Sequence, residues 1–358
     1  MAAAIFPRIL ALINRMRVGI GLIVAVFTVY GFANLLEGDS DSRFGGNNLD
    51  SPCAGNSSSE SKLVRTNFKS DTVYYVPFNG KLVRVEIKVS NYVGSTVPRK
   101  MLLLLPGWNF ADTQWCTRTR VCEEASKKGF DVMLVEMGKS VYMDSVYPQM
   151  RADYRLFPTR TWLWDSVLQP LQSRGYFTDQ GIPEDPIETA TGKVLYQSLE
   201  LPIPSFVMGL STGARGALLL ALEHPEAFKG CAGLSGDYNP LLMTNDNLMI
   251  NCLGKYEAFP WRWRGTNNIQ LRVDSMAVPM YLAHGMADKM VGSNQTESLI
   301  KALESSKQFQ LRASNHSKTH KNSSLVRYKM TKGAGHDYAF WNVAGLQALD
   351  YFNTLIID

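Results

Sequence analysis

The sequence has few cysteines and few charged residues, and each shortage excludes a class of protein. Five cysteines among 358 residues are too few for a disulfide scaffold, and no Cys-x-x-Cys pair or Cys/His cluster marks a metal site. The net charge of +5 is spread along the chain, without a Lys/Arg block dense enough to follow a phosphate backbone. We therefore expect no metal, no other cofactor and no nucleic-acid partner.

Cys116 and Cys122 are the cysteines nearest to each other in the sequence. On one continuous helix, residues six apart are separated by roughly 9 Å along the axis, beyond the reach of a disulfide. We therefore predict no disulfide pairing from the sequence.

Charge is absent altogether from residues 18–36, which follow a basic segment, residues 1–17, and precede Glu37. The run just reaches the roughly 20 residues that span a bilayer, and its basic flank predicts a body outside the cytoplasm. A retained signal anchor is the favoured interpretation. Gly31-Phe32-Ala33 keeps a removed signal peptide open as the alternative. A buried core helix is disfavoured because the run has no polar face.

Residues 37–65 are rich in Gly, Asn, Ser and Asp and are predicted to form a flexible stalk. Sequons for N-glycosylation begin at Asn56, Asn294, Asn315 and Asn322, as a lumenal or extracellular body would allow. The remaining residues, 66–358, contain enough apolar material for one domain, since 45% of the chain is hydrophobic.

Strands and helices are predicted to alternate along this domain. Asn79-Gly80 predicts a hairpin between residues 73–76 and 81–89. Short apolar runs without alternation are typical of strands buried on both faces of a parallel sheet. They cover residues 101–105, 132–135, 206–208, 280–283 and 325–330, with helices expected at 214–223, 296–304 and 345–355. The pattern predicts an α/β fold, a mostly parallel sheet with helices on both faces.

The motif Gly209-Leu210-Ser211-Thr212-Gly213 lies between one of these strands and a helix. In a nucleophile elbow the serine occupies a strained turn so tight that the residues two before and two after it must be small. Gly209 and Gly213 meet that requirement. We therefore predict Ser211 as a nucleophile.

A serine hydroxyl needs a base to accept its proton and a carboxylate to orient that base. Asp288 and His336 follow late strands in the order expected after an elbow serine. Asp237 is the competing acid and is less favoured, because Asp288 belongs to a compact strand and turn unit. The other histidines are assigned structural or solvent-exposed positions: His224, His284, His316 and His320.

The oxyanion formed by attack needs preorganised donors. The backbone N–H of Thr212 is one predicted donor, and that of Trp108, in the turn Pro106-Gly107-Trp108-Asn109, is the other. Tryptophan side chains are expected either to wall the acyl pocket or simply to pack in the core: Trp108, Trp115, Trp162, Trp261, Trp263 and Trp341.

From about residue 100 onward, these motifs resemble the putative-esterase branch of the α/β-hydrolases, which includes S-formylglutathione hydrolase (esterase D) and the bacterial mycolyltransferases. The resemblance rests on the elbow with its helix and on Gly335-His336-Asp337, followed by an aromatic run. It implies an α/β-hydrolase fold and a carboxylesterase-type serine hydrolase. Pro106-Gly107-Trp108 departs from the branch pattern.

We therefore expect hydrolysis of a carboxylic or thio ester, of a small-molecule, lipid or sugar substrate, through an acyl-enzyme on Ser211. An acyltransferase of the mycolyltransferase type is the alternative enzyme, because its first half-reaction is identical. A hydrolase-like binding protein without catalysis is the alternative outside enzymes. The sequence does not separate hydrolysis from transfer.

Overall fold

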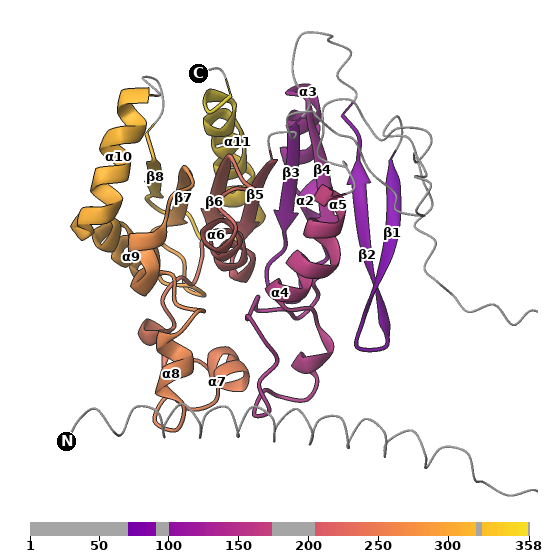
Figure 1. The fold of residues 1–358 in the computed structure, drawn as a ribbon, viewed down its shortest axis with the longest axis vertical. Coiled ribbons are helices and arrows are strands. Elements are labelled where there is room, and N and C mark those ends of the chain that lie inside the picture. The colour runs from indigo at the N-terminus through magenta and orange to yellow at the C-terminus, as the bar shows by residue number, and fades with distance from the viewer. Residues whose placement is uncertain (1–70, 91–99, 174–204, 320–323, 357–358) are drawn as a thin grey trace, which may run out of the picture. The chain divides into compact units, whose positions relative to one another are not determined.

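Eight short strands rich in apolar residues form one sheet in the computed structural model (Figure 1). The structure describes residues 71–90, 100–173, 205–319 and 324–356, all within the unit spanning residues 63–358. The sheet order is β1-β2-β4-β3-β5-β6-β7-β8. The strands are β1 (Thr72–Phe78), β2 (Lys81–Lys88), β3 (Lys100–Leu105), β4 (Phe130–Val135), β5 (Ser205–Leu210), β6 (Gly230–Leu234), β7 (Met280–Gly285) and β8 (Val326–Thr331).

The predicted hairpin is confirmed. β1 pairs antiparallel with β2, and Asn79 and Gly80 both adopt positive φ, 46° and 75°, as a two-residue hairpin turn of this kind requires. β2 also pairs antiparallel with β4. The remaining neighbours in the sheet, in the order β4-β3-β5-β6-β7-β8, all pair parallel. The prediction of a mostly parallel sheet is therefore confirmed.

Helices cover both faces of the sheet, and β3 shows why its sequence has no polar alternation. Met101, Leu103 and Leu105 join one apolar cluster, while Leu102 and Leu104 join another on the opposite face. Both faces are dry, so both sets of side chains are apolar. The first face carries α5 (Gln169–Ser173), α6 (Thr212–Glu223) and α9 (Asn294–Ser305), and the second carries α3 (Val121–Lys127) and α11 (Tyr338–Thr354).

Several helices differ from the sequence prediction, and two of them show a clear structural cause. α11 begins at Tyr338, seven residues before the expected start, because Asp337 accepts a hydrogen bond from the N–H of Phe340 and caps the helix there. Residues 307–319, a polar stretch without a predicted helix, form α10 (Lys307–Thr319). Its buried Phe309 packs into the first cluster, so tertiary contact supports the helix.

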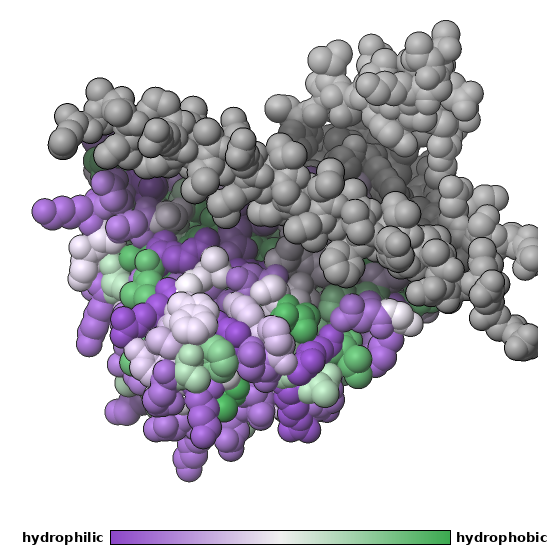
Figure 2. Space-filling model, turned by 60° about the horizontal axis from the view of Figure 1, so that its bottom comes forward, coloured by the Kyte–Doolittle hydropathy of each residue, from purple (hydrophilic) through white to green (hydrophobic). Residues whose placement is uncertain are grey.

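Chain inserted beyond the carboxyl ends of the strands builds a third apolar cluster. It joins residues from the loop after β4 to the short helices α7 (Asn247–Leu253) and α8 (Pro260–Arg264), both at the bottom of Figure 1. Its buried members are Val141, Met143, Met150, Tyr154, Met249, Cys252, Leu253 and Trp263. In Figure 2 hydrophobic side chains on this side lie in separate patches among hydrophilic ones.

A disulfide joins Cys116 to Cys122, with Cα atoms 5.1 Å apart. The two cysteines do not lie on one continuous helix, so the geometry that excluded this pair does not apply. α2 (Gln114–Thr117) ends before α3 begins at Val121, and the break brings the two Cα atoms within disulfide reach.

Replacing both Cys116 and Cys122 with Ala is expected to lower the free energy of unfolding by about 2 kcal/mol, because the unfolded chain loses a short closed loop. Calorimetry should show a lower Tm for the variant. Wild type in dithiothreitol should match it, and the reductant should leave the variant's Tm unchanged. An equal Tm for wild type and variant without reductant would contradict a stabilising bond.

The predicted anchor and stalk, residues 18–36 and 37–65, lie outside the described residues. Within the described part of the chain, no helix is both long enough and apolar enough to span a bilayer.

Candidate active site

Ser211 lies between β5 and α6 on the tight turn that the motif predicts. Its backbone is in a strained region, with φ 55° and ψ −127°, and its N–H donates to the carbonyl of Leu234 at 2.8 Å. A Cβ on Gly209 would lie 2.0 Å from the carbonyl oxygen of Gly213, and one on Gly213 would lie 2.5 Å from that of Leu105. Only glycine therefore fits at either position.

The three predicted triad side chains lie together at the carboxyl edge of the sheet. Nε2 of His336 lies 3.0 Å from Oγ of Ser211, and Nδ1 lies 2.6 Å from Oδ2 of Asp288. The ring of Trp341 packs edge-on against that of His336, with centroids 4.9 Å apart. The imidazole is thus held between the hydroxyl and the carboxylate.

The turn that carries Asp288 packs directly against the turn that carries His336. The N–H of Ala287 donates to the carbonyl of Ala334 at 2.9 Å, and a Cβ on Gly285 would lie 2.4 Å from that same oxygen. Glycine at 285 therefore permits the close approach of the two loops.

His284 is buried completely beneath this turn, more deeply than the sequence suggested. Its Nδ1 lies 2.7 Å from Oγ1 of Thr296, and its Nε2 lies 2.9 Å from the carbonyl of Val291 and 3.4 Å from Oδ2 of Asp288. Nε2 therefore carries the proton that it shares with this carbonyl and carboxylate. The role of His284 in the acid turn was not predicted, because the sequence does not show that its loop folds back over it.

Hydrogen bonds keep Asp288 charged although it is buried. Burial raises the pKa of its carboxyl, but donors from His284, His336 and the N–H of Val291 outweigh burial and hold the pKa below its ordinary value. The N–H groups of Met290 and Val291 both donate to Oδ1 at 2.9 Å. Oδ1 thus accepts hydrogen bonds from the turn, and Oδ2 accepts one from the imidazole of His336.

Asp237, the competing acid, pairs with a different residue. Its Oδ2 lies 3.2 Å from Nη1 of Arg215, and both side chains are buried. Burial raises the pKa of Asp237, and the charge of Arg215 acts in the opposite direction. Arg215, four residues after Ser211 on α6, also donates to the carbonyl of Val141 at 2.6 Å. Asp237 therefore belongs to an ion pair behind the elbow.

The turn after β3, where a second oxyanion donor was predicted, lies against Ser211. A Cβ on Gly107 would lie 3.0 Å from the Cβ of Ser211. Among the described residues, the backbone N–H groups of Trp108 and Thr212 have no hydrogen-bond partner within the protein. Both predicted donors are thus free and belong to segments that meet at Ser211.

Most of the tryptophans are packing residues. The indole N–H of Trp115, Trp162 and Trp263 each donates to a backbone carbonyl, that of Leu105, Pro77 and Gly254 respectively. Trp261 is exposed, Trp341 supports His336, and Trp108 packs edge-on against Tyr154 beside the third cluster.

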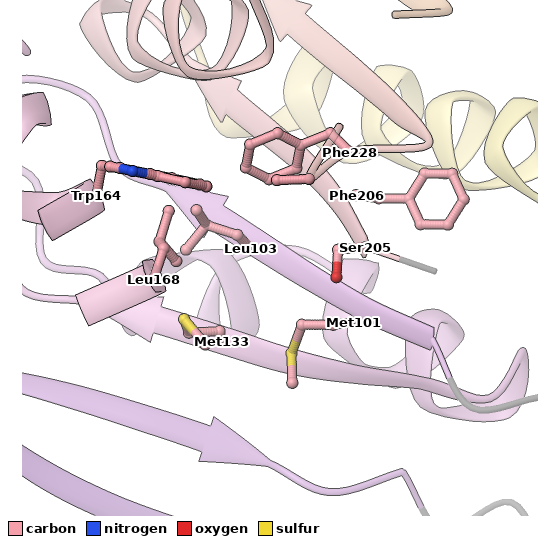
Figure 3. Close-up of a pocket in the computed structure, with 9 residues that line it drawn as sticks. Met101, Leu103, Met133, Trp164, Leu168, Ser205, Phe206 and Phe228 are labelled. Carbon is pink, nitrogen blue, oxygen red and sulfur yellow. The ribbon is translucent and has the colours of Figure 1, made fainter. Parts of the chain in front are cut away.

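Neither of two cavities in the described structure is lined by a triad residue. The first, shown in Figure 3, lies among side chains of β3, β4, β5 and the π-helix Leu163–Leu168, together with Phe228 from the loop after α6. Its roughly 20 Å³ holds about one water molecule, too little for a substrate. The second, of about 320 Å³, includes Met290 and Gly292 of the acid turn and Asp246 of the inserted chain in its wall. This larger cavity is large enough for part of a substrate.

Residues 195–351 match the protein family described as Putative esterase. Among solved structures, FphF, a fluorophosphonate-binding serine hydrolase of Staphylococcus aureus, is 15% identical over 79% of this chain and 96% of its own, with a TM-score of 0.51. An S-formylglutathione hydrolase from Agrobacterium tumefaciens is 14% identical over 82% of this chain and 98% of its own, with a TM-score of 0.54.

A dipeptidyl aminopeptidase IV homologue from Bacteroides ovatus is 11% identical over 79% of this chain but only 35% of its own, with a TM-score of 0.52. A search of curated proteins gave no match. At these identities the structural likeness establishes a shared α/β-hydrolase-like fold. The family match confirms the resemblance inferred from the elbow and histidine motifs.

Proposed function

Because residues 195–351 fall within the Putative esterase family, we propose that this chain hydrolyses carboxylic or thio esters through an acyl-enzyme on Ser211. One observation supports this above all. The chain of contacts from Ser211 through His336 to Asp288 is unbroken, with distances of 3.0 and 2.6 Å. A non-catalytic binding protein would have no need for this alignment.

In the proposed reaction His336 is the general base. Its Nε2 accepts the proton of the Ser211 hydroxyl while Oγ attacks the acyl carbon, and the imidazolium then protonates the departing alcohol or thiol. Asp288 accepts a hydrogen bond from Nδ1–H and stabilises the imidazolium charge. A water molecule deprotonated by the same Nε2 hydrolyses the acyl-enzyme, and an alcohol in its place would complete an acyl transfer.

The carbonyl oxygen becomes negatively charged during attack and needs donors that are already in place. We assign this role to the N–H groups of Thr212 and Trp108. Thr212 is the first residue of α6, where the helix dipole favours negative charge. Because neither N–H has a partner within the described protein, each donor can serve the oxyanion without breaking an existing bond.

The disulfide supports a lumenal or extracellular site for the reaction. Disulfides such as Cys116–Cys122 persist in oxidising compartments and are rare in the cytosol. We propose that residues 18–36 retain the domain at a membrane on that side. In the sequon that begins at Asn294, the asparagine is exposed at the start of α9. The Thr296 of the same sequon is buried, and its hydroxyl contacts His284.

Incubating the folded protein with a fluorophosphonate probe should attach one label to Ser211, since its Oγ faces a base and lies on the elbow. Peptide mass spectrometry would locate the adduct. Heat-denatured protein should remain unlabelled, which controls for unspecific reaction. Absence of labelling in folded protein, or a label on Ser235, the other buried serine with positive φ, would reject the proposal.

A further inference from the structure

Tyr142 is held in a strained backbone conformation at a fully buried position. Its φ is 54°, in the left-handed region that large side chains avoid, and its exposed fraction is 0%. Its N–H donates to Oγ of Ser140 at 3.1 Å, and its carbonyl accepts from Nη1 of Arg160 at 3.1 Å. Such strain persists only where the surroundings enforce it, and it often marks a functional position.

Two buried arginines hold the segment around Tyr142. Arg160 binds its carbonyl and also forms a bidentate pair with Glu223 at the end of α6, at 2.7 Å for each contact. Arg215 of α6 donates to the carbonyl of Val141 at 2.6 Å. The segment around Tyr142 is therefore bound to both ends of α6, the helix that follows Ser211.

The side chain of Tyr142 connects that helix to the turn after β3. Its ring lies on Gly216 of α6, where a Cβ would be 2.5 Å from Cδ1 of the ring. Its hydroxyl donates to the carbonyl of Pro106 at 2.8 Å. Burial raises the pKa of Tyr142 well above its ordinary value, so the hydroxyl keeps its proton and remains a donor.

Three successive peptide groups in this turn are fixed by hydrogen bonds, and the first of them contains the carbonyl of Pro106. The carbonyl of Gly107 accepts from the N–H of Phe110 at 3.1 Å, and the N–H of Asn109 donates to the carbonyl of Gly138 at 2.8 Å. The peptide group between Gly107 and Trp108 is thus oriented by its neighbours, and its own N–H stays free.

We infer that Tyr142 is a positioning residue, which orients the backbone N–H of Trp108 toward the oxyanion by holding the carbonyl of Pro106 at a fixed distance from α6. This inference rests on the proposed function. Within the described residues, the hydrogen bonds of Tyr142 join it to Ser140, Pro106 and Arg160 and not to the triad. Its effect should therefore be confined to steps in which charge develops on the carbonyl oxygen.

The test is Tyr142→Phe, which keeps the ring on Gly216 and removes only the hydroxyl. We expect kcat for p-nitrophenyl acetate to fall about 10- to 100-fold, as for a displaced oxyanion donor, while KM changes less than twofold. Affinity for a boronic acid, which forms a tetrahedral adduct with Ser211, should fall by a similar factor.

Tyr351→Phe is the matched control. Its hydroxyl also donates from a buried side chain to a backbone carbonyl, that of Ser324 at 2.6 Å, but it lies on α11 and takes no part in the turn. Both variants should lose a similar Tm, about 2–4 °C, but only Tyr142→Phe should lose kcat.

Equal kcat and boronate affinity in wild type and Tyr142→Phe would overturn the inference and leave a packing role. The inference would also be overturned if KM and kcat fell together in both Tyr142→Phe and Tyr351→Phe. Failure of the proposed function would show differently, as activity that persists in Ser211→Ala.

Discussion

Ser211→Ala is expected to lower kcat for p-nitrophenyl acetate by about 10⁶-fold, because no other group can form the acyl-enzyme. His336→Ala should cause a similar loss, since without Nε2 at 3.0 Å from Oγ the hydroxyl keeps its proton during attack. Alanine keeps the Cβ at both positions, so the fold should survive and Tm should change little.

The double variant Ser211→Ala/His336→Ala tests whether the two residues act together or contribute independently to the rate. If the two groups act as one unit, the double variant should be no slower than either single variant. Steady-state rates above the uncatalysed background would be measured on protein with wild-type circular dichroism. More than 1% residual activity in Ser211→Ala would falsify the nucleophile assignment.

Asp288→Asn is expected to reduce kcat by about 10⁴-fold with the loop intact. The asparagine can still accept the N–H groups of Met290 and Val291 through its carbonyl oxygen. Its amide group then replaces Oδ2 and donates toward His336, which favours the tautomer that cannot deprotonate Ser211. The charge that stabilises the imidazolium is also lost.

Asp237→Asn is the control for this assignment. Its kcat should stay within tenfold of wild type at low temperature, because His336 bonds to Asp288 instead. Its stability should fall by about 3 kcal/mol, since Arg215 would be left as a buried charge without a counter-ion. Urea unfolding and kcat would be measured for both variants. The reverse ranking, with Asp237→Asn inactive and Asp288→Asn active, would reassign the acid.

The triad could be proposed from the sequence because each member follows a predicted strand. The strand before His336, β8, is an edge strand with exposed and half-buried residues, so the prediction that residues 325–330 are buried on both faces was wrong. Parallel strands end at one edge of a sheet, so side chains as distant in sequence as Ser211 and His336 meet there. The glycines of the elbow were equally predictable, because steric contact at Gly209 and Gly213 excludes any Cβ.

The supporting contacts could not be predicted, since they depend on how irregular loops return to the sheet. Tyr142 looks like any aromatic residue in a loop, and only the fold places its hydroxyl on Pro106, 36 residues earlier. The Cys116–Cys122 bond depends on a helix break between them that no Pro or Gly marks. Arg215 is flanked on α6 by small and apolar residues, and its buried partner Asp237 belongs to another turn.

The third apolar cluster has an evolutionary consequence. Its buried residues, among them Met143, Met249 and Trp263, are separate from the two clusters that stabilise the sheet. The cluster nevertheless contacts the catalytic scaffold, because Trp108 packs against it and Arg215 of α6 donates to Sδ of Met249 at 3.3 Å. Residues in contact do not have additive effects, so in descendants of one ancestral chain we expect substitutions in this cluster to be accompanied by compensating changes around Trp108 and Arg215.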